Sequence, residues 1–442
     1  MHIDLSFSAG LNLAKRYLRS VLSTILADKQ TNHIVLFLVV VQILGILAGL
    51  LFFPHGLGYM SGTIFHKLLT WNGLNYLGIG QNGYMWNKTY CLTHHCDLAF
   101  FPLQGMLNKV FLFPFGHDIA VICIVLISLL LGITSIFCFA RLARTVMSQG
   151  AGSAIFLYAL YPGSVFFLMG YPTGIMLITV ILALHNALQN RWWWAALCIG
   201  IGTAAGPEVI FVGFAIGVYF LFDQFRKYQI PLAVFRSLGW ALLALSGLLC
   251  FMAYQYIAFG DATASITALT RASGAVAPMD KISRLATSYW YIAYYMEVVG
   301  WYKDAFHTLL IQHGNKVILF QSLKMHLSDF IVFVIQSILN LTFFVTAWVG
   351  LILCGFFCVG KKARLLLCGS SAAVLIGYLW FVLATQWDME STIRLLFPAV
   401  ALFIGLGGLT HKFKLLGYGL FPFFTVITFL QIAFVASGYQ VN

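Results

Sequence analysis

Charged side chains are scarce in this chain. Lys, Arg, Asp and Glu make up 9% of the 442 residues, only 13 of them are acidic, and hydrophobic residues make up 61%. This composition leaves too little polar surface to cover a soluble globule, so it predicts a polytopic membrane protein. The apolar runs are also far longer than barrel strands. Because every backbone polar group within hydrocarbon needs an internal partner, these runs predict α-helices.

Several features of other protein classes are missing. The chain has no Gly-rich phosphate-binding loop, no Ser-His-Asp arrangement and no motif for a soluble nucleotide sugar. It also has no heptad array, internal repeat or low-complexity tail. No small-residue cleavage pattern follows the first apolar run at 34–53, so we expect that run to be a retained membrane helix and not a signal peptide.

The excess of positive charge follows a membrane topology. With a cytoplasmic N-terminus, the inner segments carry fifteen Lys and Arg residues and three Asp residues, and 15 minus 3 equals the whole net charge of +12. The outer segments are balanced, as the positive-inside rule expects. Because these bases are spread over short loops, we predict no nucleic-acid partner, a cytoplasmic N-terminus and a C-terminus, residues 438–442, on the outside.

The apolar runs predict an all-α bundle of about 11 transmembrane helices that forms a single domain over residues 1–442. The predicted spans are 34–53, 118–140, 151–169, 172–188, 193–205, 208–222, 233–258, 330–358, 365–385, 393–410 and 415–437. The run 193–205 is short for a hydrocarbon core of about 30 Å. We therefore expect a broken or partly inserted pair there, which changes the count by up to two. Two large outer loops are predicted at 54–117 and 259–329, with an interfacial or re-entrant helix at 101–113 in the first.

Polar and aromatic motifs follow one another at the predicted outer ends of the helices. They are Trp71-Asn72-Gly73, Gly83-Tyr84, Asp97-Leu98-Ala99-Phe100-Phe101-Pro102-Leu103, Leu160-Tyr161-Pro162-Gly163-Ser164-Val165-Phe166-Phe167, Gly170-Tyr171, Phe259-Gly260-Asp261 and Arg394-Leu395-Leu396-Phe397-Pro398. In this order they resemble the pattern of the PIG-V family, the GPI mannosyltransferase 2 group and its bacterial relatives. That pattern includes a short aromatic-rich helix that ends at Gly83-Tyr84.

The resemblance implies a GT-C-like glycosyltransferase. Such a protein takes mannose or a related hexose from a polyprenyl-phosphate sugar and inverts the anomeric carbon as an acceptor hydroxyl attacks. The implied partners are the lipid-linked sugar, membrane lipids and a glycan, lipid or protein acceptor. The chemistry needs a carboxylate for the acceptor proton and a cation for the departing phosphate. Compact loops and the lack of a lumenal retention signal favour a bacterial inner membrane over the endoplasmic reticulum.

The chain departs from the family pattern at its acidic positions. Asn72 replaces the family Asp, and Tyr171 is followed by no acid where the family has Tyr-Ser-Glu. Asp97 stands where the family has Asn, and Glu208 is an additional acid. Three explanations stay open: a base relocated to Asp97 or Glu208, altered chemistry in which Asn72 orients a hydroxyl, or a degenerate relative that binds a lipid-linked glycan or assists a partner enzyme. We predict Asp97 as the base.

The resemblance and the residue types also suggest substrate-binding positions. Trp71, Asn72, Tyr84 and Tyr171 would shape the sugar and acceptor site. Arg394 would hold the donor phosphate, since a guanidinium forks onto phosphate oxygens, or it is an interface anchor paired with Asp388 or Glu390.

Two acids add to this prediction. Glu208 is costly within hydrocarbon, so we expect it to line a cavity or meet a cation. Asp261 either binds substrate or caps the next helix.

One cluster in the first outer loop leaves its chemistry open. Cys91, His94, His95 and Cys96 would form a disulfide between the two cysteines, bind zinc, or remain free. The spacing matches no standard structural zinc pattern. We therefore predict no cofactor and assign no metal ligand, although a divalent metal is compatible with the composition.

Overall fold

The computed structural model describes residues 28–52, 63–69, 72–85, 97–266, 268, 339–340, 342–385 and 392–437. Within these ranges the chain is helical and contains no strand. The elements in chain order are α2 (Lys29–Phe52), α3 (Ile64–Leu68), α4 (Asn72–Asn82), η2 (Asp97–Ala99), α5 (Pro102–Val146), α6 (Ala151–Ala159), η3 (Pro162–Phe167), α7 (Thr173–Leu188), α8 (Trp192–Thr203), α9 (Glu208–Lys227), α10 (Ile230–Ala244), α11 (Ser246–Phe259), α16 (Lys361–Thr385), α17 (Thr392–Leu395), α18 (Ala401–Lys412) and α19 (Lys414–Ala436). A further apolar helix covers Thr342–Phe357.

Several of these helices have the length and composition of membrane spans. Among the described residues there are five such helices, or six if α10 and α11 form one broken span. Large apolar side chains point outward from them, such as Leu36, which is 62% exposed, and Leu242, which is 63% exposed. An outward apolar surface is favourable in lipid and costly in water. The all-α membrane protein predicted from composition is confirmed, whereas eleven crossings and a GT-C fold stay predictions.

Three of the predicted continuous spans are broken in the structure, two of them near proline. The predicted span 151–169 ends as an α-helix at Ala159 and continues as η3, which begins at Pro162. The predicted span 393–410 is divided between α17 and α18, with Pro398 in the gap. Proline has no backbone N–H and cannot continue an α-helix without losing a hydrogen bond.

The third break lies beside a close contact between helices. The predicted span 233–258 is divided into α10 and α11, whose axes differ by 62°. A Cβ atom on Gly247 would lie 2.3 Å from the carbonyl oxygen of Gly200 in α8. The helices α8 and α11 therefore approach backbone to backbone just after the bend. A residue larger than glycine at position 247 would not allow this approach.

The first outer loop returns to the bundle through α5. This helix begins at Pro102 and has a non-helical residue at Gly116, where φ is 70°, before its membrane-spanning part. The break separates the segment predicted as an interfacial helix at 101–113 from the span that follows it. A separate helical segment thus precedes the span, and its place at the membrane interface stays a prediction.

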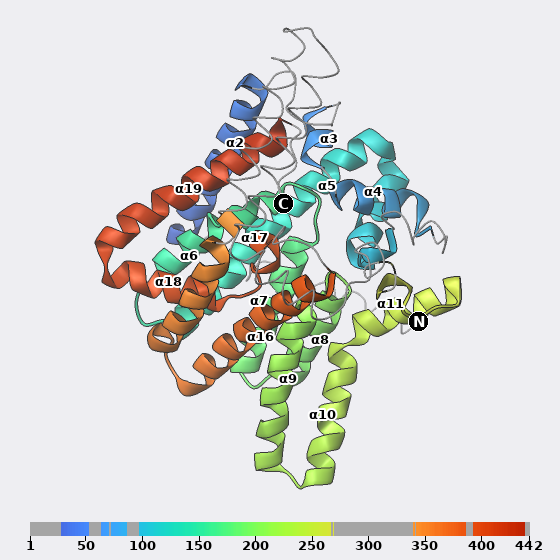
Figure 1. Cartoon of the computed structure of the whole chain (residues 1–442), viewed down its shortest axis with the longest axis vertical. Helices are drawn as coiled ribbons and strands as arrows, with labels where there is room; N and C mark the ends of the chain where they lie inside the picture. The colour runs from blue at the N-terminus through green and yellow to red at the C-terminus, as the bar shows by residue number, and fades with distance from the viewer. Residues whose placement is uncertain are drawn as a thin grey trace, which may run out of the picture.

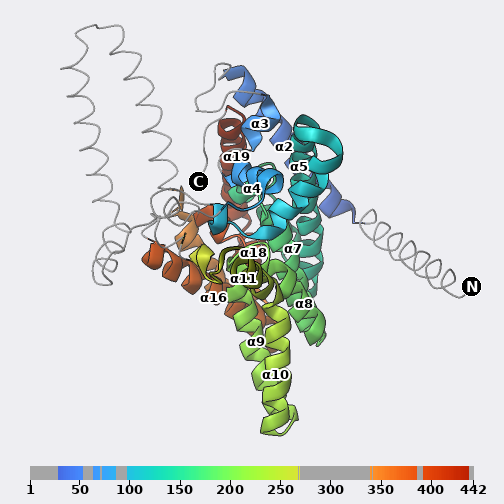
Figure 2. The same cartoon turned by 90° about the vertical axis from the view of Figure 1, so that its right-hand side faces the viewer.

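The loops predicted to be cytoplasmic lie together. Arg144 donates a hydrogen bond of 2.8 Å to Asp28, and the backbone N–H of Val359 donates to Val146 at 2.7 Å. The helices α9 and α10 run away from α3 and α4, which lie at the opposite end of the bundle in both views (Figures 1 and 2). The long helices pack in pairs, α2 with α19, α7 with α8, and α9 with α16.

Candidate functional site

The short helix α4 packs closely against two neighbouring segments, the residues after η3 and the helix α5. A Cβ atom on Gly73 would lie 2.3 Å from the carbonyl oxygen of Met169, just after η3. On the other side, a Cβ atom on Gly105 of α5 would lie 2.5 Å from the Ile79 side chain. The helix ends at Gly83, whose φ of 73° favours glycine. The sequence predicts a short helix that ends at Gly83-Tyr84, and α4 is a helix in that place with close contacts at Gly73 and Gly105.

The start of α4 meets the segment that follows η3. Tyr171 is 4% exposed, and its hydroxyl receives a hydrogen bond from the backbone N–H of Asn72. The Tyr171 ring stacks on that of Phe166, with centroids 5.2 Å apart. The first-loop motif and the Gly170-Tyr171 motif are therefore in direct contact.

Arg394 brings a cation to this pair of rings. Its guanidinium carbon lies 5.4 Å from the centroid of Tyr171 and 6.0 Å from that of Phe166. These distances are typical of cation–π interactions. The position is fixed by Phe397, three residues later, which stacks on Phe167 of η3 with centroids 5.7 Å apart.

Glu208 is an acid whose carboxyl group is partly removed from solvent. It is the first residue of α9 and interacts electrostatically with Arg394. Its Oε2 is removed from solvent and has no hydrogen-bond partner among the described residues. A Cβ atom on Gly206 would lie 2.6 Å from this oxygen, so the carboxyl group lies over that glycine. An unpaired buried carboxylate oxygen is costly, and such groups are common at functional sites.

Tyr76 of α4 interacts with several of these residues, and the sequence motifs did not identify it. Its side chain interacts electrostatically with Arg394, Glu208 and Tyr171. It is 6% exposed, and burial raises the pKa of its hydroxyl, so the group stays protonated and can donate a hydrogen bond. Its spacing in the sequence could have pointed to Tyr76, because a residue four positions after Asn72 lies on the same helix face.

Tyr84 and Asp97 form a neighbouring group. The Tyr84 hydroxyl donates a hydrogen bond of 2.7 Å to the carbonyl oxygen of Phe100. The Phe100 ring meets that of Tyr76 edge to face, with centroids 5.3 Å apart. Asp97 interacts electrostatically with Tyr84, and partial burial raises the pKa of the Asp97 carboxyl above its ordinary value. Phe100 therefore connects the two groups, because it contacts both Tyr84 and Tyr76.

Asp261 has a local contact. Its Oδ1 accepts hydrogen bonds from the backbone N–H and the hydroxyl of Thr263, at 2.8 and 2.9 Å. This is the geometry of an Asx turn, which agrees with a capping role. Phe259 of the same motif packs with Leu98 and Tyr84.

The remaining predicted positions lie outside the described residues. They are Trp71, Cys91, His94, His95, Cys96, Asp388 and Glu390. The proposed pairing of Arg394 with Asp388 or Glu390 and the disulfide or zinc site in the first loop stay predictions.

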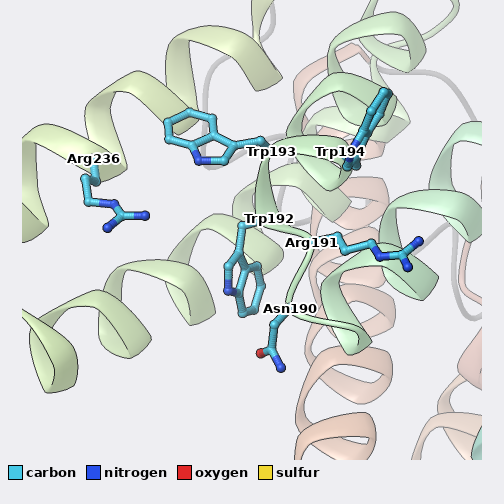
Figure 3. Close-up of a pocket in the computed structure, with 6 residues that line it drawn as sticks. All are labelled: Asn190, Arg191, Trp192, Trp193, Trp194 and Arg236. Atoms are coloured by element: carbon cyan, nitrogen blue, oxygen red, sulfur yellow. The ribbon is translucent and has the colours of Figure 1, made fainter.

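A separate hollow of about 350 Å³ lies at the other end of α7. Tyr171 precedes this 16-residue helix and Asn190 follows it, so the two ends are about 24 Å apart at 1.5 Å per residue. In Figure 3 the rings of Trp192 and Trp193 lie on the side toward Arg236, whereas Trp194 and Arg191 point the other way. Indole rings with cations are typical of the lipid headgroup region.

Comparisons with known proteins complete the description of the site. No protein-family model matches the chain, and a search of curated proteins finds no match.

Proposed function

We propose that the chain is an integral membrane glycosyltransferase of the PIG-V-like, GT-C type. It transfers mannose or a related hexose from a polyprenyl-phosphate donor to an acceptor at the outer face of a bacterial inner membrane. The observation that carries this proposal is the convergence of motifs from distant parts of the sequence on one place. Asn72, Tyr171 and Arg394 belong to three of these motifs and meet at the Tyr171 side chain, with which Tyr76 interacts electrostatically.

The rest of the first-loop motif reaches the same place. Asp97 and Phe100 lie beside Tyr84 and Tyr76, and Phe259 of the Phe-Gly-Asp motif packs against Leu98. A random set of short matches has no reason to assemble in space. The convergence therefore supports a common role for motifs that are individually weak.

The arrangement supplies the groups that inverting sugar transfer requires. Arg394 binds the donor phosphate as a charge-assisted hydrogen-bond donor and stabilises the negative charge that develops as the sugar leaves. The rings of Tyr76 and Tyr171 line the sugar position, and the protonated Tyr76 hydroxyl donates to a sugar or phosphate oxygen. The polyprenyl chain of the donor lies in lipid, so only the donor head group reaches α4.

The bond changes follow from this placement. The acceptor oxygen attacks the anomeric carbon from the face opposite the phosphate, and the new glycosidic C–O bond forms. The bond from the anomeric carbon to the phosphate oxygen breaks, and its electron pair leaves with the polyprenyl phosphate. The acceptor proton goes to Asp97, whose raised pKa brings it closer to neutrality and makes it a better base.

Glu208 has a different role in this scheme. Its electrostatic interaction with Arg394 orients the guanidinium on the rings. Glu208 is also the alternative base. If the acceptor hydroxyl binds nearer to Arg394 than to Asp97, Glu208 takes the acceptor proton instead of Asp97. Replacing each acid by its amide distinguishes the two assignments. The amide variant of the base should still bind the donor but should not turn it over.

The experiment uses purified full-length protein, radiolabelled polyprenyl-phosphate hexoses with mannose first, and a bacterial membrane lipid extract. We expect label to move into a new product with wild-type protein and to move much more slowly with the Arg394→Ala variant. Arg364→Ala, an exposed change at the predicted cytoplasmic end, is the matched control and retains transfer. Retention of the donor without transfer by wild type would overturn the enzyme proposal and favour a degenerate lipid-glycan binder, which Asn72 in place of an acid would explain.

A further inference from the structure

Three potential metal ligands meet near the start of the α5 span. They are His66 of α3 and the neighbouring residues His117 and Asp118 of α5, and their ligand atoms all lie within 4.8 Å of one another. His66 is partly exposed, and the other two are exposed. The group is distinct from the residues around Tyr76 and has no part in the proposed transfer reaction.

The spacing of the two imidazoles fits a metal ion between them. The Nε2 atoms of His66 and His117 are 3.3 Å apart. Two nitrogen ligands about 2.05 Å from a tetrahedral zinc ion are separated by about 3.3 Å. With the carboxylate of Asp118 as a third ligand, one coordination position is left for water. Imidazoles suit zinc, whereas magnesium and calcium prefer sites made of oxygen ligands.

The other ring nitrogen of each histidine has a polar neighbour. The Thr63 hydroxyl lies 2.8 Å from Nδ1 of His66, and the Gln81 side-chain amide contacts Nδ1 of His117. Histidines that bind metal usually donate this second N–H to an oxygen, which fixes the ring. A half-turn of the Gln81 amide exchanges its oxygen and nitrogen, so its oxygen can accept from His117.

The local fold explains why these residues meet. The non-helical Gly116 interrupts α5 directly before His117 and Asp118. The helix α3 packs against α5, and α4, which carries Gln81, also packs against it. Three segments of the first outer loop therefore contribute to one cluster, although 51 residues separate the two histidines.

We propose that His66, His117 and Asp118 bind a Zn²⁺ ion. The ion joins α3 to α5, and the Gln81 contact extends that link to α4. The competing arrangement is a metal-free chain of hydrogen bonds from Gln81 through His117 and His66 to Thr63, which the same contacts would also allow. Metal affinity distinguishes the two directly.

The test uses full-length protein purified in detergent with a tag that contains no histidine and then treated with a chelator. Zinc chloride is titrated into it by calorimetry, and cobalt is used separately to observe ligand-field bands. We expect one tight site in the wild type. Because loss of an outer partner alone costs about 10–100-fold in affinity, His66→Ala and His117→Ala should each weaken binding by more than about tenfold. His33→Ala, an exposed change on α2, is the control and keeps wild-type affinity.

Folding and competing ligands are checked in the same series. The His117→Gln variant removes the ligand with a smaller change of volume, and zinc should raise the melting temperature of wild type but not of this variant. Absence of tight binding to wild type would overturn the proposal in favour of the hydrogen-bond chain. Binding that survives His66→Ala with His117→Ala, and is lost on changing Cys91 and His94, would overturn it in favour of the other cluster.

Discussion

The guanidinium carbon of Arg394 lies 5.4 Å from the centroid of the Tyr171 ring, although the two residues belong to distant parts of the sequence. Tyr171 is in turn stacked on Phe166. The cation therefore lies over a stacked pair of rings, and both rings belong to the sequence motifs.

The first prediction concerns this cation. Arg394→Lys keeps the charge but loses the planar fork, and Arg394→Ala loses both. Since hydrogen bonds to charged groups contribute about 1.5–3 kcal/mol, we expect the alanine variant to lower kcat/KM by about 10–100-fold, with an intermediate value for lysine. Steady-state transfer from a polyprenyl-phosphate hexose measures the effect. A lysine variant as active as wild type would show that forked phosphate binding is not required.

The second prediction concerns the proton acceptor. Asp97→Asn should abolish turnover and leave donor binding intact, whereas Glu208→Gln should weaken donor binding. Because the base must be ionised, the transfer rate should rise with pH through the pKa of Asp97, which burial raises above its ordinary value. A pH profile of kcat/KM for wild type and both variants measures this. Full turnover by Asp97→Asn, with loss in Glu208→Gln, would assign the base to Glu208.

The third prediction tests how α4 is held. A Cβ atom on Gly73 would meet the carbonyl oxygen of Met169 at 2.3 Å, and backbone cannot move away easily. We expect Gly73→Ala to destabilise the protein by about 1–3 kcal/mol and to reduce transfer. Gly78→Ala on the same helix is the matched control because no atom lies within 4 Å of its Cβ position. That variant should be neutral or slightly more stable in a detergent melting assay. Equal melting temperatures for the two variants would contradict the packing of α4.

The fourth prediction concerns the link between α2 and α5. Partial burial of Asp28 acts to raise its pKa, but hydrogen bonds from Arg144 and Thr31 outweigh burial and hold that pKa below its ordinary value. A lowered folded-state pKa stabilises the protein above the unfolded-state pKa, and this contribution is lost as the pH falls through the folded-state value.

Asp28→Asn should therefore reduce stability at neutral pH by roughly 0.2–1 kcal/mol, as for other exposed ion pairs. The difference from wild type should disappear in strong acid and shrink in high salt. Thermal melting of the two proteins across pH measures it. A difference that grows as the pH falls would contradict this assignment.

Composition and hydropathy were sufficient to predict an all-α membrane protein, and the pattern around Gly83-Tyr84 predicted α4. The breaks near Pro162 and Pro398 were missed because hydropathy measures how apolar a segment is and not whether its helix is continuous. The bend at Leu245 lies beside the close contact of Gly247 with Gly200, which exists only after α8 and α11 pack and is not visible in hydropathy.

The candidate site was predictable in part. The motifs identified Asn72, Tyr171 and Arg394, but not Tyr76, which interacts electrostatically with Tyr171 and Arg394. Tyr76 is one of 20 tyrosines, and nothing in its neighbours distinguishes it until α4 is docked. The pairing of His66 with His117 is a tertiary contact that spacing in the sequence cannot reveal.

The most direct measurement is the location of bound donor. A polyprenyl-phosphate mannose analogue with a photoreactive group near the phosphate is irradiated with purified protein, and the labelled peptides are sequenced. The account predicts label in α4 and in the segment 166–176, with loss of that label in Arg394→Ala. Label confined to the Trp192 and Arg236 hollow, at the opposite end of α7, would contradict it.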